Sequence, residues 1–324
     1  MGDTVDGMGW LQWLSPQGWV TRVDAYAGDQ FAVLGLFLLA SLAEVAVALI
    51  LLHRRDVGLA LYPARLGPAG NPRLSSAGAL AGRLHRGSLI GWGVGFVAFG
   101  AITGGIAASA GDLITSSPQL ADIIARLGGA GVLIDTFLAA LGAYAGLLAG
   151  AYVISAVLRA HTEETAERVG PVLATAVGRG RWLSGHLVFA LGGAVALLAL
   201  CGLVTGLLHG VRVDDLIAGL GKGLATMLIQ IPPVLVMGGV AAALYGWVPR
   251  LAAVAWVALG LALVFGLLGR LLQLPAALLD VSPYTHMPAL PTGDMRWGPV
   301  FVELAVAVAL VAVGIAGFRR RDVV

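Results

Sequence analysis

Residues 159–182 read RAHTEETAERVGPVLATAVGRGRW, the only long stretch of the chain that is dense in both acidic and basic side chains. Long apolar segments lie on both sides of it, near residues 129–158 and 183–208. Each is long enough to cross a bilayer, which takes about 20 apolar residues. We therefore expect residues 159–182 to form a polar loop that joins two membrane-spanning helices.

This loop is predicted to contain short helices. Thr162 can cap a helix whose first turn carries Glu163 and Glu164, because acidic side chains favour the positive end of a helix. Gly170 and Pro171 are expected to end that helix.

A second turn is predicted to follow. Pro171 can open it, and it carries Val172, Leu173 and Val177. A short helix with one polar and one apolar face can dock into a groove on a soluble partner. The alternative is a solvated loop that only fixes the topology of the chain.

The whole chain has the composition of a membrane protein. Of its 324 residues, 58% are hydrophobic and only 12% are charged, whereas a soluble domain has about 25% charged residues. Because an open strand edge is not tolerated in lipid, the fold class is predicted to be all-α and polytopic. Seven predicted spans lie near residues 31–52, 87–110, 129–158, 183–208, 224–247, 250–272 and 299–318.

Basic residues predict the orientation of the spans. With the C-terminus in the cytoplasm, fourteen of the twenty Lys and Arg residues fall on the cytoplasmic side and six on the outer side. The positive-inside rule therefore predicts an outer N-terminus, a cytoplasmic C-terminus and a cytoplasmic 159–182 loop.

An internal repeat links the two ends of the chain. Ser15-Pro16 precedes a span that ends at Arg54-Arg55-Asp56-Val57, and Ser282-Pro283 precedes a span that ends at Arg320-Arg321-Asp322-Val323. The offsets are 267 and 266 residues, so the first span is the predicted counterpart of the last.

The repeat predicts three regions. Residues 1–58 would hold an interfacial segment and the last helix of an incomplete first half. Residues 59–86 would form a cytoplasmic linker that ends, from residue 74, either as an amphipathic elbow helix on the inner leaflet or as plain linker. Residues 87–324 would form a complete six-helix half.

No enzyme signature is found in the sequence. Gly219-Leu220-Gly221-Lys222 lacks the spacing and the Ser or Thr of a phosphate-binding loop. The six histidines show no paired metal-ligand spacing. We therefore expect the chain to be no enzyme and to bind no metal or cofactor itself.

A few residues within the spans are candidates for a translocation path. They are Asp135, Gln230, Pro232, Pro233 and Glu303. A charge inside a bilayer is costly, so the two carboxylates should face protein or water, unless they snorkel or, for Glu303, pair with Arg270. The prolines break the fifth span, which either exposes carbonyls to a path or is an ordinary packing kink.

Residues 273–298 are predicted to form an ordered, partly re-entrant cap on the outer face. Its distinctive residues are Ser282, Pro283, His286, Pro288 and Pro291. Proline fixes φ, so three prolines within ten residues restrict the backbone. Trp297 at the end of the segment is typical of the membrane interface.

Several stretches, in this order and spacing, resemble a known family. They are Leu84–Trp92, Glu163–Trp182, Tyr245–Arg250 with Trp256, Ser282–Pro291 and Arg320–Asp322. With them the chain resembles type-2 ABC exporter permeases, in the branch described as polyketide-antibiotic exporters and tetronasin-resistance permeases.

The resemblance implies a twelve-span permease of two similar halves in the bacterial plasma membrane, paired with separate subunits that bind ATP and Mg²⁺. The loop would couple to that partner through Glu163, Glu164, Glu167, Arg168, Val172, Leu173 and Arg179. Gly170 stands where the family usually has an acidic residue, and Glu167 can substitute for it. Other implied partners are the lipid bilayer and a second permease half or another copy, with no nucleic acid.

The function implied by the resemblance is outward movement of hydrophobic compounds such as antibiotics. A secondary transporter driven by an ion gradient is one alternative, although the coupling loop and the lack of a clear proton relay argue against it. A non-transporting remnant of a truncated permease is the other, because five of the twelve implied spans are not in the sequence.

Overall fold

The computed structural model describes residues 9–23, 31–53, 74, 76–116, 130–269 and 272–322. All regular elements among these residues are helical, which confirms the all-α fold class. Seven of the described helical segments are long and apolar enough to cross a membrane, as the sequence predicts. They cover Phe31–His53, Ala77–Ala107, Gly131–Thr165, Arg179–Arg212, Leu216–Trp247, Pro249–Gly266 and Trp297–Arg320.

The chain divides into two compact units, residues 1–70 and 71–324. The first contains η1 (Gly9–Leu14), α1 (Pro16–Val23), η2 (Phe31–Val33) and α2 (Leu34–His53). The rings of Trp19 on α1 and Phe37 on α2 meet edge-on, with centroids 5.2 Å apart. No residue of α2 is buried, so its apolar sides suit lipid or other protein. Of the predicted linker, residues 59–86, residues 59–73 and 75 lie outside the described residues.

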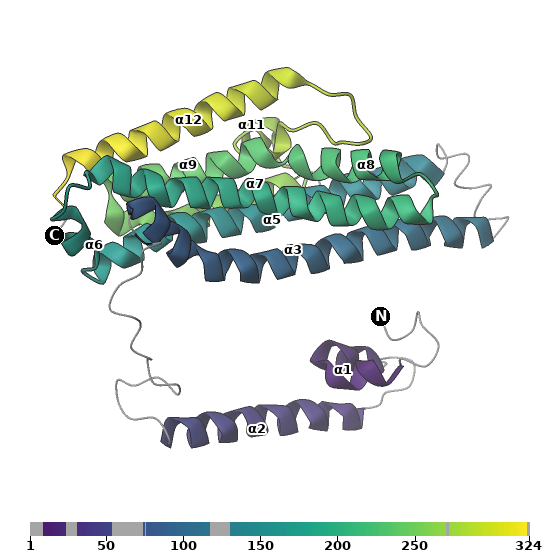
Figure 1. Ribbon diagram of the computed structural model, residues 1–324. Helices are drawn as coiled ribbons and strands as arrows, with labels where there is room; N and C mark the ends of the chain where they lie inside the picture. The colour runs from purple at the N-terminus through teal and green to yellow at the C-terminus, as the bar shows by residue number, and fades with distance from the viewer. Residues whose placement is uncertain are drawn as a thin grey trace. The chain divides into compact units, whose positions relative to one another are not determined.

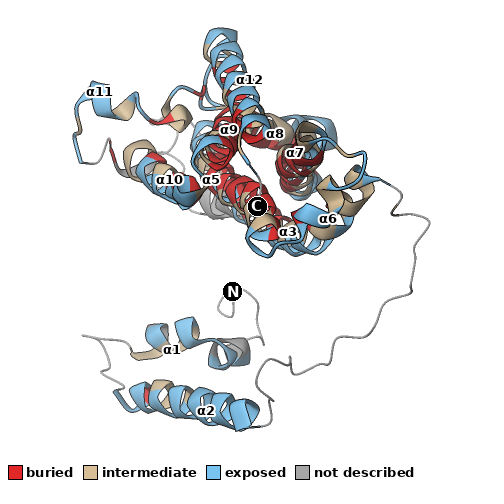
Figure 2. Ribbon diagram, turned by 90° about the vertical axis from the view of Figure 1, so that its left-hand side faces the viewer, coloured by how far each residue is buried: buried red, intermediate tan, exposed pale blue. Residues whose placement is uncertain are grey.

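The second unit is a helical bundle (Figure 1). Its long helices are α3 (Ala77–Ser116), α5 (Ala130–Thr165), α7 (Arg179–Arg212), α8 (Leu216–Leu228), α9 (Ile231–Trp247) and α12 (Trp297–Arg320). Its shorter elements are α6 (Val169–Leu173), η4 (Pro249–Val254), α10 (Ala255–Leu263), the π-helical η5 (Val264–Leu268), α11 (Ala276–Leu279) and η6 (Pro283–Thr285). Helix α7 packs against α3, α5 and α8, and α9 packs against α5 and α12. Figure 2 shows that buried residues gather on the inward sides of α5, α7 and α9.

The predicted elbow helix is not a separate element. Helix α3 runs without a break from Ala77 to Ser116, so residues 77–86 continue the second span. Ala81 and His85 are 1% and 2% exposed, and the His85 ring stacks on Phe189 of α7. Because Ala81 and the neighbouring Gly82 are small, this end of α3 packs closely on α7. The residues expected to form an elbow helix or a plain linker are thus the first turns of α3, and one side of them packs on α7.

The fifth span consists of two helices and not of one kinked helix. Helix α8 ends at Leu228 and α9 begins at Ile231, which places Pro232 and Pro233 in the first turn of α9. The first N–H groups of a helix have no partner within it, so proline loses no hydrogen bond there. The two prolines therefore open a new helix.

Glycines bring α7 close to its neighbours. A Cβ atom on Gly104 of α3 would lie 2.7 Å from the Thr205 carbonyl oxygen of α7. A Cβ atom on Gly206 of α7 would lie 2.7 Å from the Gly219 carbonyl oxygen of α8. Small residues permit such close helix packing in membranes, and any larger side chain here would push the helices apart.

Candidate functional site

The loop between α5 and α7 begins later than the sequence predicts. Helix α5 continues to Thr165, and the Thr162 hydroxyl donates to the Leu158 carbonyl, 3.2 Å away, within that helix. The predicted Thr162 cap and new helix are therefore wrong. Glu167, with φ of 57°, reverses the backbone and ends the helical run.

Glu163 lies in the last turn of α5 and is buried, with 4% exposure. Its Oε1 accepts a hydrogen bond from Arg159 Nε at 3.2 Å and is 3.4 Å from Arg168 Nη1. Arg159 is four residues earlier on the same helix face, so the pair supports continuation of α5. Glu163, which the resemblance implies as a coupling residue, is therefore paired with two basic residues of its own chain.

Glu164 joins the loop to the C-terminal end of the chain. Arg321 donates from Nη1 to Oε1 and from Nη2 to Oε2, each at 2.6 Å, and the Tyr245 hydroxyl donates to Oε2 at 2.6 Å. Two parallel bonds of this kind form a strong, geometrically specific ion pair. Arg179 adds a bond from Nη1 to the Arg321 carbonyl at 2.9 Å. We call Glu164, Arg179, Tyr245 and Arg321 the loop clamp.

Aromatic rings lie beside the loop clamp. Phe318 of α12 stacks on Trp182 of α7, with centroids 5.5 Å apart, and lies 5.6 Å from the Tyr245 ring of α9. The Arg321 guanidinium lies over Phe318 at 4.8 Å. The base of the loop is therefore fixed to α7, α9 and α12, and Figure 1 shows α6 and the C-terminus at the same end of the bundle.

The middle of the loop has one buried and one exposed side. Val169 of α6 is 2% exposed, and Val172 and Leu173 pack against the core of the bundle. The expected apolar plug for a partner is thus half-buried within this chain. The exposed side carries Glu167, Arg168, Gly170, Pro171 and Thr175. We call these five residues the outer loop face.

The candidate path residues lie in different surroundings. Lys222 Nζ of α8 donates to both carboxylate oxygens of Asp135 on α5, at 2.7 and 3.0 Å. Gln230, which is 7% exposed, lies beside Gly146 in the middle of α5. Glu303 on α12 is 7% exposed, and its Oε1 lies 3.6 Å from His286 Nδ1. Arg270, the alternative partner of Glu303, lies outside the described residues.

The segment 273–298 folds back into the bundle. The buried Ser282 hydroxyl donates to the Ala262 carbonyl at 3.2 Å, and Pro283 opens η6. The Tyr284 hydroxyl donates to the Gly146 carbonyl in the middle of α5 at 3.1 Å. Pro288 is also buried, whereas Pro291 is half-buried. The sequence gives no signal for the contact of Tyr284 with α5, because a lone tyrosine in a loop shows no pattern.

Comparison with known proteins identifies the family. A family model described as multidrug efflux system permease Rv1217c, C-terminal domain, matches residues 74–319. The chain belongs to this Rv1217c family of efflux permeases. The multidrug efflux system permease protein Rv1217c of Mycobacterium tuberculosis is 38% identical over 322 residues. The match covers 98% of this chain but 58% of the relative, so the chain spans little more than half of that relative's length.

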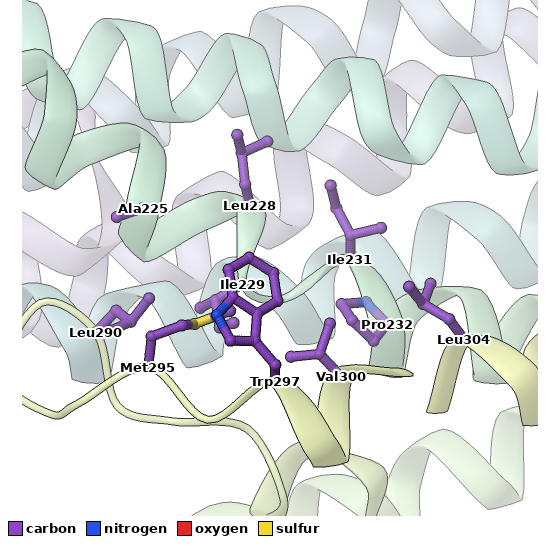
Figure 3. Close-up of a pocket in the computed structure, with 10 residues that line it drawn as sticks. All are labelled: Ala225, Leu228, Ile229, Ile231, Pro232, Leu290, Met295, Trp297, Val300 and Leu304. Atoms are coloured by element: carbon purple, nitrogen blue, oxygen red, sulfur yellow. The ribbon is translucent and has the colours of Figure 1, made fainter. Parts of the chain in front are cut away.

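In this member of the Rv1217c family, two grooves flank the N-terminal part of α12. The cap groove, of about 310 Å³, has the lining shown in Figure 3: Ala225, Leu228, Ile229, Ile231, Pro232, Leu290, Met295, Trp297, Val300 and Leu304. Apart from the Trp297 N–H, those side chains are apolar. The Glu303 groove, of about 420 Å³, is lined by Val236, Val281, Pro283, His286, Pro299, Val302, Glu303 and Val306.

Proposed function

We propose that the chain is a membrane-spanning permease subunit of a type-2 ABC exporter that moves hydrophobic compounds, such as antibiotics, outward. A separate subunit would bind ATP and Mg²⁺ and drive transport. The Mycobacterium tuberculosis relative, which is named as a multidrug efflux system permease, supports this function. Membership of the polyketide-antibiotic and tetronasin-resistance branch is part of the same proposal.

The loop clamp is the observation that carries the proposal. A coupling loop must accept a push from a partner and pass it to the spans, which needs an exposed face on a firmly anchored base. The outer loop face offers the first, and the 2.6 Å contacts of Glu164 with Arg321 and Tyr245 offer the second. A push on α6 would thereby move α9 and α12 together with α5 and α7.

The location follows from the same loop. We infer that it faces the bacterial cytoplasm together with the C-terminus, because a partner that hydrolyses ATP needs cytoplasmic ATP. The basic residues Arg159, Arg168, Arg179 and Arg181 near this end favour that side. A second permease half or another copy, which the resemblance implies, would complete the path in the bilayer.

Efflux from cells that express the chain with its ATP-binding subunit tests the proposal. Vanadate, which traps ABC ATPases, should stop export, whereas an uncoupler at unchanged ATP concentration should not. The buried carboxylate of Glu303 is the one observation that favours a gradient-driven transporter instead. Efflux that stops with the uncoupler and continues with vanadate would favour that second function and reject the first.

A further inference from the structure

The Glu303 groove holds a single carboxylate among largely apolar side chains. Its volume of about 420 Å³ lies within the range of small-molecule sites, roughly 300–1,000 Å³. The cap groove on the other side of α12 has no charged side chain in its lining. The carboxylate therefore distinguishes the Glu303 groove from its neighbour.

The Glu303 carboxylate is buried without a hydrogen-bond donor. Its side chain is 9% exposed, and neither oxygen accepts a hydrogen bond from the described residues. His286 Nδ1, at 3.6 Å from Oε1, is too far for one. The Tyr284 hydroxyl donates to the Gly146 carbonyl and not to Glu303.

A buried carboxylate without a hydrogen-bond donor is costly, and ionisable residues within membrane spans commonly mark ligand pathways. A bound cation would supply the missing opposite charge. The groove reaches the outside of the bundle through Val281, Val302 and Val306, which are 64%, 63% and 44% exposed. A ligand that enters there must be compatible with apolar surroundings.

We propose that the Glu303 groove binds lipophilic organic cations, with Glu303 as the counter-ion and the surrounding valines and prolines as the apolar walls. As a step of transport, this site rests on the proposed exporter function. Binding itself does not depend on ATP, so the site can be tested separately.

Equilibrium dialysis of the purified full chain in lipid nanodiscs tests the site with radiolabelled tetraphenylphosphonium. Tetraphenylborate, of similar shape and opposite charge, serves as the comparison in a separate sample. We expect the cation to bind and the anion not to bind. Glu303→Gln should weaken cation binding about ten- to a hundredfold, because the cation loses its contact with a charged group. Asp294→Asn removes a charge from an exposed position in the 273–298 segment, outside the groove, and should leave binding unchanged.

A second pair of variants tests charge without removing Glu303. His286→Arg places a permanent cation beside Glu303 and should reduce tetraphenylphosphonium binding about as strongly as Glu303→Gln. His286→Gln is neutral and should keep binding within about twofold of the wild type. Binding to Glu303→Gln at the wild-type level, equal binding by both His286 variants, or equal binding of both probes would overturn the proposal.

The same samples separate this site from the exporter function. If binding depends on Glu303 but vanadate does not affect efflux, the site stands and the ABC mechanism fails. If efflux is sensitive to vanadate but Glu303→Gln binds the cation normally, the ABC mechanism stands and the site fails.

Discussion

At the scale of single residues, Glu164, in the last turn of α5, connects that helix to α9 and to the C-terminal end of α12. Its carboxylate receives hydrogen bonds from Arg321 and Tyr245, and its side chain is only 11% exposed. Breaking a buried ion pair leaves the other charge desolvated, which costs far more than loss of a surface pair. Glu167, three residues later, is exposed.

Glu164→Gln should therefore destabilise the chain by about 1–3 kcal/mol, because Arg321 loses its opposite charge in a half-buried position. The matched change Glu167→Gln should stay within about 0.5 kcal/mol of the wild type, as exposed substitutions do. Thermal unfolding of the purified full chain in detergent measures both. Identical melting temperatures for the two variants would show that the loop clamp does not stabilise the fold.

At the scale of elements, apolar runs predict the spans because length and hydropathy are local properties of the sequence. The contacts at the end of α5 have no signal in the local sequence, because Arg321, the partner of Glu164, is 157 residues away. Local patterns likewise suggested a helix start at Thr162 and a kink at Pro232, where the structure has a continuing helix and a new one. The sequence therefore indicates the candidate residues of the loop but not their partners within the chain.

Two glycines on α7 allow a matched test of helix packing. Gly206→Ala should destabilise the chain by about 1–3 kcal/mol, because the added methyl group would clash with the Gly219 carbonyl oxygen of α8. Gly192→Ala, where nothing lies within 4 Å, should be neutral or stabilise by up to about 1 kcal/mol through helix propensity. Chemical unfolding in mixed micelles compares them. If Gly206→Ala is as stable as Gly192→Ala, close contact between α7 and α8 at Gly206 does not stabilise the bundle.

At the scale of the whole molecule, the two units repeat an order of elements. Pro16 opens α1 ahead of the long α2, and Pro283 opens η6 ahead of the long α12. In both cases a Ser-Pro pair precedes a short helix and then a span. The order agrees with the sequence repeat, although α1 and η6 differ in length and type.

The predicted orientation has a direct test. A green fluorescent protein fused after Val324 should fluoresce, because this protein folds in the bacterial cytoplasm, and an alkaline phosphatase fusion at the same site should be inactive. The reason is the excess of basic residues on the side of the C-terminus. An active alkaline phosphatase fusion together with a green fluorescent protein fusion that does not fluoresce would place the C-terminus outside.

The outer loop face is proposed to receive an ATP-binding partner, and Gly170 provides the most direct probe of that contact. Gly170 is exposed, and a Cβ atom there meets nothing within 4 Å, so Gly170→Trp adds bulk without disturbing this chain. Gly221→Trp on α8 is the matched control, since Gly221 is equally open.

The measurement is drug-stimulated ATP hydrolysis by the complex purified with its ATP-binding subunit. We predict that Gly170→Trp lowers the stimulated rate at least about tenfold and reduces co-purification of the partner, because a bulky ring clashes at the interface. Gly221→Trp should match the wild type in both. A Gly170→Trp complex with wild-type assembly and wild-type stimulated hydrolysis would contradict the claim and leave the loop as a connector between two spans.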